Sequence, residues 1–181
     1  MHASTQPHPT QRIVLTGFMG SGKSTVGPLI ARRLGWRFID VDNVIEADAG
    51  MKISEIFAQQ GEAAFRAQEQ ATIARLSSEN NLVLALGGGA IESEPTRILL
   101  LQSPGTLLVH LEVELATTLL RCGGTEGTRP VLADRANLEA RYTRRLPLYR
   151  TAHVSISVDR LTPNQVVTAV IQSAGIDRPA Q

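Results

Sequence analysis

Residues 17–25 read GFMGSGKST and join two segments of opposite character. The preceding residues, IVLT, form a short apolar run that is typical of a buried strand in a parallel sheet. The following residues place apolar side chains at helical spacing and end at Gly35, a residue suited to closing a helix. A buried strand that passes through a glycine turn into a helix predicts a layered α/β fold.

The same alternation of strands and helices continues along the chain. Further strands are predicted in RFIDVD, NLVLAL, TLLVHL and HVSISV, at residues 37–42, 81–86, 106–111 and 153–158. Further helices are predicted at residues 44–49, 54–77, 94–102, 114–121, 137–146 and 162–174. Strands that alternate with helices in this way favour a parallel sheet with helices on its faces.

Local signals refine several of these helices. Pro28 removes a backbone donor early in the first helix, so that helix should bend or begin later than its apolar pattern suggests. Gly61 should break the helix at residues 54–77, and Pro147 should end the helix before it. Thr162 followed by Pro163 predicts an N-cap and a first helical position.

The chain is expected to form one domain with short loose ends. No internal repeat or low-complexity linker divides it. We expect a disordered tail at residues 1–11, a single α/β domain at residues 12–174 and a frayed end at residues 175–181. Ligands of such sheets bind beyond the carboxyl ends of the strands, so candidate site residues are sought there.

Composition narrows the class of partner. The chain has 181 residues, of which 43% are hydrophobic, and its 18 Lys and Arg residues nearly balance its 17 Asp and Glu residues. This balance predicts no nucleic-acid partner. Cys122 is the single cysteine, which excludes an internal disulfide or a zinc site of several thiolates. No apolar run has the length of a membrane span, and we expect a cytoplasmic monomer that binds small molecules.

The glycine turn itself satisfies the spacing G-x-x-x-x-G-K-[ST], with Gly17, Gly22, Lys23 and Ser24 at the defined positions. Such a loop turns backbone N–H groups toward phosphates, its lysine reaches the β- and γ-phosphates, and its serine offers an oxygen to Mg²⁺. The sequence therefore predicts a site for a nucleoside triphosphate with Mg²⁺. The residues expected to bind ATP here are Gly20, Ser21, Gly22, Lys23, Ser24 and Thr25.

Two carboxylates follow the second predicted strand. Asp40 and Asp42 both stand at its end, and we expect their side chains to point to opposite sides of the chain there. Asp40 could support Mg²⁺ through its water shell, and Asp42 could accept a hydrogen bond from an attacking hydroxyl. The alternative is that Asp42 caps the helix that follows, which would not exclude a catalytic role.

Arginines at two places offer a clamp for a planar carboxylate. Arg66 stands three residues before Glu69 on a predicted helix, where an exposed ion pair is the simpler interpretation. Arg144 and Arg145 stand just before Pro147 and are equally ambiguous alone. Guanidinium groups match carboxylates in a forked geometry, so a carboxylate ligand would give these residues a common purpose.

The loop RCGGTEGTRPVL, at residues 121–132, combines glycine hinges with Arg129 next to Pro130. A mobile cover that brings an arginine to a transferring phosphoryl group has these features. An ordinary flexible surface loop is the alternative.

Three consecutive glycines, Gly87, Gly88 and Gly89, follow the predicted strand at residues 81–86. A turn requires one or two glycines, so the third indicates a ligand that approaches the main chain closely. We expect Gly87 to serve the turn, and Gly88 and Gly89 to face the ligand.

Together these segments resemble the shikimate kinase family. The resemblance extends from Arg12 to about Ala174 and includes GFMGSGKSTVG, FIDVD, IFAQQGEAAFRAQE, LALGGGA, TRPVL and RRLPLY in the family's order. It implies transfer of the γ-phosphoryl group of ATP to the 3-hydroxyl of shikimate. It also implies a five-stranded parallel sheet of order 2-3-1-4-5, with a lid and a substrate-binding helical segment.

The resemblance assigns roles position by position. It implies that Lys23 and Ser24 hold the phosphates and Mg²⁺, and that Asp40 acts on the metal from outside its ligand shell. Asp42 would hold the substrate hydroxyls and act as a base, with Glu69 supporting the site. The remaining implied contacts are Arg66 and Arg145 with the substrate carboxylate, Gly88 and Gly89 with the ring hydroxyls, Arg129 with the phosphates and Arg121 with the adenine.

Three other functions are alternatives to this one. A gluconate kinase would also bind a hydroxylated acid, although the triple glycine and the RRLPLY run favour shikimate. A nucleoside monophosphate kinase would need to stack a second base, and aromatic residues make up only 4% of the chain. A nucleotide-binding relative without catalysis would be expected to have lost some of these residues, and all of them are present.

Overall fold

A computed structural model describes residues 9–122 and 135–176 of the chain. Its sheet contains β1 (Arg12–Thr16), β2 (Arg37–Asp40), β3 (Leu82–Ala85), β4 (Thr106–Glu112) and β5 (Val154–Ser157). The strands lie in the order β2-β3-β1-β4-β5, and every neighbouring pair is parallel. The predicted α/β class and strand order are confirmed.

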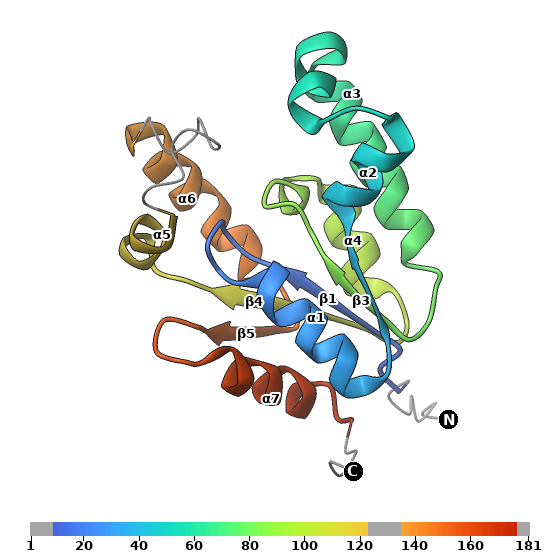
Figure 1. The fold of residues 1–181 in the computed structure, drawn as a ribbon, viewed down its shortest axis with the longest axis vertical. Coiled ribbons are helices and arrows are strands. Elements are labelled where there is room, and N and C mark those ends of the chain that lie inside the picture. The colour runs from blue at the N-terminus through green and yellow to red at the C-terminus, as the bar shows by residue number, and fades with distance from the viewer. Residues whose placement is uncertain (1–8, 123–134, 177–181) are drawn as a thin grey trace, which may run out of the picture.

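Helices cover both faces of this sheet. They are α1 (Lys23–Leu34), α2 (Val41–Ala49), α3 (Ile53–Leu76), the 3₁₀ turn η1 (Ala90–Glu92), α4 (Glu94–Gln102), α5 (Leu115–Cys122), α6 (Arg135–Tyr149) and α7 (Pro163–Ser173). α1 packs against α7 on one face, and α4 packs on β4 with α3 beside it on the other. α2 and α3 lie on one side of the carboxyl ends of the strands, and α5 and α6 lie on the other (Figure 1).

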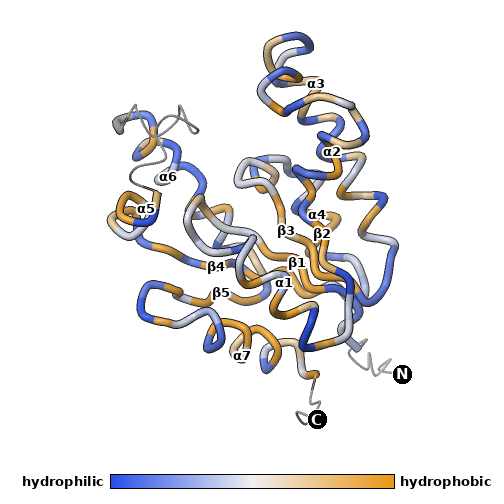
Figure 2. Tube along the Cα trace, in the orientation of Figure 1, coloured by the Kyte–Doolittle hydropathy of each residue, from blue (hydrophilic) through white to orange (hydrophobic). Residues whose placement is uncertain are grey.

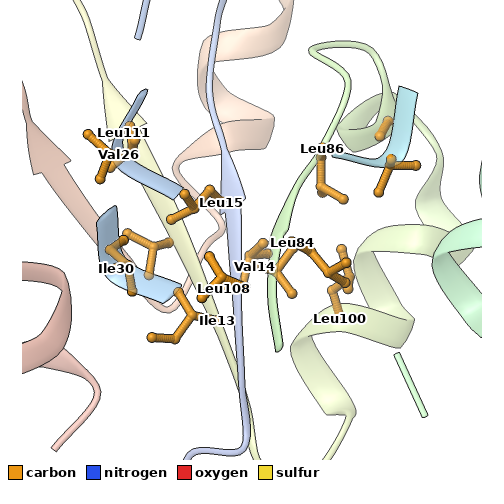
Figure 3. Close-up of a cluster of buried hydrophobic side chains, with 14 of the residues drawn as sticks. Ile13, Val14, Leu15, Val26, Ile30, Leu84, Leu86, Leu100, Leu108 and Leu111 are labelled. Carbon is orange, nitrogen blue, oxygen red and sulfur yellow. The ribbon is translucent and has the colours of Figure 1, made fainter. Parts of the chain in front are cut away.

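The core is built around β1, whose five residues are all buried. Ile13 and Leu15 lie on the side of Ile30 from α1, whereas Val14 lies on the side of Leu100 from α4 (Figure 3). Side chains of a strand alternate between its faces, so a continuous apolar run buries both faces at once. The hydrophobic colouring of the central strands in Figure 2 follows the same pattern.

Four details bear on the local predictions. Gly61 has φ 83° and ψ 169°, and it interrupts α3 as expected. Thr162 caps α7 through a hydrogen bond that its side chain accepts from the Gln165 N–H, also as expected. α1 begins at Lys23 and continues through Pro28, so the prediction of a later start is wrong. α6 continues through Pro147 to Tyr149, so the prediction that Pro147 ends this helix is also wrong.

The second strand and the helix after it also differ from the prediction. β2 ends at Asp40, and α2 begins at Val41 rather than at residue 44. The Asp40 side chain accepts a hydrogen bond from the Asp42 N–H at 3.1 Å, so Asp40 is the N-cap. Asp42 therefore lies in the first turn of a helix, and the prediction that both carboxylates stand at the end of a strand is wrong.

In the described parts of the chain, no helix combines the length and apolar character needed to cross a membrane.

Candidate functional site

A cavity of about 800 Å³ lies beyond the carboxyl ends of the central strands. Its wall contains residues from the glycine turn, the start of α2, the segment after β3, the end of α5, α6 and the segment between β5 and α7. The predicted site residues among them are Gly20, Ser21, Gly22, Lys23, Ser24, Thr25, Asp40, Asp42, Gly88, Arg121 and Arg145. Residues more than 100 positions apart thus share one wall. The predicted residue Arg129 lies outside the described residues.

The glycine turn joins β1 to α1 with a backbone that requires glycine. Gly22 has φ 93° and stands at the N-cap of α1. A Cβ at Gly17 would lie 2.5 Å from the Leu111 carbonyl oxygen, so a side chain there would force the turn away from β4. The Lys23 Nζ donates to the carbonyl oxygens of Gly17 at 2.7 Å and Phe18 at 3.2 Å. Its ammonium group is therefore held over the loop where phosphates would bind.

Arg121 spans the opposite edge of this part of the cavity. Its guanidinium donates to the Gly20 carbonyl at 3.0 Å and to the Val158 carbonyl at 3.1 Å. Sequence reasoning missed the apolar surface beside it, which is formed by Cys122, Val158, Leu161, Pro163 and Val166. The position of the last four just after the carboxyl end of the last strand was the available signal. An apolar surface near a phosphate-binding loop suits a nucleotide base.

Asp42 lies where several charges meet. Burial raises its pKa to about 6, Asp40 adds to this effect, and Lys23 and Arg66 oppose it. Its Oδ1 is buried and accepts no hydrogen bond within the described residues. A buried carboxylate oxygen without a donor is costly, and a hydroxyl from a ligand would supply the missing bond.

Arg66 and Glu69 form a pair that is far less exposed than the simpler interpretation assumed. The Arg66 Nη1 lies 2.7 Å from the Glu69 Oε2, and the Glu69 side chain is only 3% exposed. Burial raises the pKa of Glu69, while its hydrogen bond from Arg66 acts in the opposite direction. Glu69 therefore lies in the interior beside Gly87 and Asp42, whereas Arg66 stays partly exposed and also pairs with Glu62 at 3.3 Å.

Arg145 is buried, whereas its neighbour Arg144 is exposed. Both contact Glu92, a residue of η1 that sequence reasoning missed. The Arg145 Nη2 and Arg144 Nε each lie 2.8 Å from a Glu92 carboxylate oxygen. Partial burial opposes ionisation of Glu92, but its hydrogen bonds from the two arginines lower its pKa below the ordinary value. No local pattern in the sequence indicated this pair.

Two of the three consecutive glycines, Gly87 and Gly89, are explained by close packing rather than by backbone conformation. None of the three has a positive φ. A Cβ at Gly87 would lie 2.7 Å from the Asp42 Oδ1, and one at Gly89 would lie 2.4 Å from the Arg66 Nη2. At Gly88 the nearest atoms would be 3.5 Å away. Gly87 is therefore needed to seat Asp42, and it also begins a turn as expected, because its carbonyl accepts a hydrogen bond from the Ala90 N–H at 3.1 Å.

The donor set suits a magnesium ion that is held largely by phosphates and water. Among the described residues, no three His, Cys, Asp or Glu side chains gather into a metal site. The exposed Ser24 hydroxyl and the Asp40 carboxylate nevertheless line the same cavity. Mg²⁺ prefers oxygen ligands and retains several waters, so one hydroxyl and a nearby carboxylate fit it.

Comparison with known proteins places the chain in a family. A family model described as shikimate kinase matches residues 19–174. The shikimate kinase of Salinibacter ruber is 40% identical over 166 residues, which cover 86% of this chain and 80% of that protein. The shikimate kinase of Persephonella marina is 39% identical over 163 residues, which cover 89% of this chain and 97% of that protein.

A solved structure agrees with these sequence matches. Shikimate kinase from Acinetobacter baumannii in complex with shikimate has a TM-score of 0.83 and 35% sequence identity to this chain. The match covers 92% of this chain and 93% of that one. The chain belongs to the shikimate kinase family.

Proposed function

We propose that this enzyme transfers the γ-phosphoryl group of ATP to the 3-hydroxyl of shikimate, giving shikimate 3-phosphate and ADP. The observation that carries the proposal is a cavity in which a phosphate-binding loop faces Asp42, Gly88 and Arg145. Phosphoryl transfer needs positioning and charge stabilisation more than covalent chemistry, and this cavity can hold donor and acceptor together.

At the nucleotide end, residues 20–25 would bind the phosphates of ATP. The Lys23 ammonium would exchange its present contacts with loop carbonyls for contacts with the β- and γ-phosphates. Arg121 and the apolar surface beside it would bind the adenine. Mg²⁺ would be held by the Ser24 hydroxyl, with Asp40 acting through water, and would supply positive charge beside the phosphates. We further propose that Arg129 approaches the transferring group.

At the acceptor end, the residues match an acid that carries hydroxyls on a ring. Arg66 and Arg145 would hold the carboxylate, because guanidinium groups pair with carboxylates through forked hydrogen bonds. The backbone of Gly88 and Gly89 would meet the ring hydroxyls. Asp42 would accept a hydrogen bond from the 3-hydroxyl, through the Oδ1 that has no donor within the described residues, and take its proton as the oxygen attacks phosphorus.

We also infer that the enzyme works as a cytoplasmic monomer. Its one cysteine, Cys122, is buried as a thiol rather than held in a disulfide, which suits a reducing compartment. Analytical ultracentrifugation would test the oligomeric state, and a dimer at micromolar concentration would contradict it.

An assay of ADP release tests the reaction. Purified enzyme with Mg²⁺ and ATP should form ADP when shikimate is added and should form none above background with gluconate. Phosphorus NMR of the product should show a phosphate ester of shikimate. ADP formation with gluconate but not with shikimate would contradict the proposal, and so would ADP formation that neither acid stimulates.

A further inference from the structure

Tyr149 is a buried tyrosine that the roles above leave unused. It is the last residue of α6, and only 1% of it is exposed. Its hydroxyl donates a hydrogen bond to the Gly88 carbonyl oxygen at 2.6 Å. Tyr149 and Gly88 are 61 residues apart in sequence, so this bond fixes one long-range contact at the acceptor end of the cavity.

The same hydroxyl also contacts Arg145. A Cβ built on Gly88 would lie 3.5 Å from both the Arg145 Nη1 and the Tyr149 hydroxyl oxygen, so both groups lie beside Gly88. Burial raises the pKa of Tyr149 to about 12, while Arg145 acts in the opposite direction through its charge and a hydrogen bond to the hydroxyl. A tyrosine hydroxyl can donate one bond and accept others, so Tyr149 can serve both neighbours at once.

Glu92 holds the other edge of the same guanidinium. The Glu92 Oε2 lies 3.0 Å from the Arg145 Nε and 2.8 Å from its Nη2. The Nη1 that remains is the one beside Gly88, where the Tyr149 hydroxyl also lies. Arg145 is thus oriented from two sides by groups that are not ligands.

A stacked histidine fixes the tyrosine ring. His110 of β4 is buried, and its ring lies 5.2 Å from the Tyr149 ring at an interplanar angle of 18°. Burial lowers the pKa of His110 to about 4, against the opposing charge of Glu112. The imidazole is therefore neutral near pH 7, and its Nδ1 lies 3.2 Å from the Ser155 hydroxyl. A planar ring stacked on a core strand leaves Tyr149 little freedom.

These contacts connect two groups that the proposed function assigns to the substrate. Because a peptide unit is planar and trans, holding the Gly88 carbonyl also fixes the direction of the Gly89 N–H. Holding the Arg145 guanidinium fixes the direction of the charge that would meet the carboxylate. One hydroxyl therefore sets the relative position of the carboxylate-binding group and the hydroxyl-binding backbone.

We propose that Tyr149 is a positioning residue for the acceptor, one that pre-arranges Arg145 and the Gly88–Gly89 peptide before the substrate enters. The proposal rests on the proposed function, because it takes shikimate as the acceptor. It adds a residue that touches no reacting atom and acts only through two groups that the proposed function assigns to the substrate.

The variant Tyr149→Phe removes the hydroxyl and keeps the ring on His110. Loss of one such hydrogen bond should raise KM for shikimate about three- to tenfold, with KM for ATP unchanged and kcat altered less than about twofold. The shikimate Kd, measured by calorimetry without nucleotide, should rise by a similar factor.

Tyr142→Phe is the matched control. Tyr142 lies on the same helix, and its hydroxyl donates to the Val113 carbonyl at 3.0 Å, so the variant also loses one bond to a backbone carbonyl. Its shikimate Kd should equal that of the wild type, even if both variants lose similar thermal stability.

Unchanged shikimate KM and Kd in Tyr149→Phe would overturn the proposal. The proposal would also be overturned if the shikimate Kd rose equally in Tyr149→Phe and Tyr142→Phe. It would be overturned too if KM for ATP rose as much as KM for shikimate, since either result would show a general structural effect. Calorimetry on the wild type distinguishes a failure of the positioning role from a failure of the proposed reaction. If the wild type binds shikimate but does not turn it over, only the proposed reaction is contradicted. Wild-type enzyme that does not bind shikimate contradicts both.

Discussion

The proposed role of Asp42 as a base needs an ionised carboxylate, but the surroundings of Asp42 disfavour the negative charge. Burial and Asp40 raise its pKa to about 6, whereas an unperturbed aspartate titrates near 3.9. Lys23 and Arg66 oppose this shift, but they do not cancel it. The carboxylate is therefore ionised at neutral pH with a pKa close enough to 7 for it to accept a proton during the reaction.

The first prediction concerns activity against pH. kcat/KM for shikimate should fall tenfold per pH unit below about pH 6, because only the ionised Asp42 can orient or deprotonate the hydroxyl. Asp42→Asn should lower kcat roughly a hundredfold or more and remove this acid limb. The control is Asp48→Asn on the same helix, where the carboxylate is 61% exposed. A profile that stays flat to pH 5 would exclude Asp42 as the titrating group.

The second prediction concerns stability, and its sign follows from the same pKa. Because the folded pKa lies above the unfolded one, the stabilising effect of protonated Asp42 is full below about pH 4 and is lost as the pH rises through about 6. A tenfold change in a proton-binding constant corresponds to about 1.4 kcal/mol. Asp42→Asn should therefore raise Tm by several degrees at pH 7.5 and by much less at pH 4. Calorimetric scans at both pH values test this, and a lower Tm at pH 7.5 would contradict it.

The third prediction separates binding from stability at Arg66. Arg66→Ala should raise KM for shikimate, but it also leaves the buried Glu69 without its 2.7 Å partner, which should lower Tm. Adding Glu69→Gln should restore much of the Tm and leave KM high. Arg75→Ala is the control on the same helix, since the Arg75 pair with Asp48 is exposed and should contribute little. Recovery of KM together with Tm would remove Arg66 from the substrate clamp.

Among the elements, the segment after β3 is the most tightly constrained. It passes between the carboxylate of Asp42 and the guanidinium of Arg66, and its backbone conformation would accept alanine. The need for glycine in this segment therefore comes from side-chain atoms on other elements. A substitution there should displace functional groups rather than unfold the segment.

The fourth prediction compares two glycines in that segment. Gly87→Ala should reduce kcat roughly ten- to a hundredfold, because its Cβ would lie 2.7 Å from the Asp42 Oδ1 and must push the carboxylate aside. Gly88→Ala should keep the wild-type Tm, since its Cβ would meet only atoms at 3.5 Å or more, and should mainly raise KM for shikimate. Steady-state kinetics and thermal scans distinguish the two. Equal kcat values in both variants would contradict the assignment.

Elements whose signals are local could be predicted from the sequence. The turn before Lys23, the break at Gly61 and the cap at Thr162 depend on residues within a few positions, and all three are in the structure. The start of α2 was missed because Asp40 and Asp42 both satisfy the pattern of a cap, and only the folded backbone selects one.

Contacts between distant elements could not be predicted in this way. Glu92 and Arg145 are 53 residues apart, and Tyr149 and Gly88 are 61 apart. Their pairing depends on how α6 packs against η1 and the triple glycine, which no periodicity encodes. The resemblance to a family supplied Arg145 and Gly88 as site residues, but not the groups that orient them.

For the whole molecule, the cavity divides between two sets of elements. The part assigned to the nucleotide is formed by α5, the turn before α1 and the segment before α7. The part assigned to the acceptor is formed by α2, the triple glycine and α6. Both sets are connected to strands of the same sheet. Each ligand should therefore stabilise the fold independently of the other.

The fifth prediction tests this division by thermal shift. A ligand at a hundred times its Kd stabilises a protein by about 2.7 kcal/mol, which should raise Tm by roughly 5–10 °C for a chain of this size. A non-hydrolysable ATP analogue with Mg²⁺ and shikimate should each raise the Tm of the wild type. Lys23→Ala should lose only the shift from the nucleotide, and Arg145→Ala only the shift from shikimate. Because the two residues are assigned to different ligands in one cavity, loss of both shifts in either variant would mean that the two ligands do not bind separately.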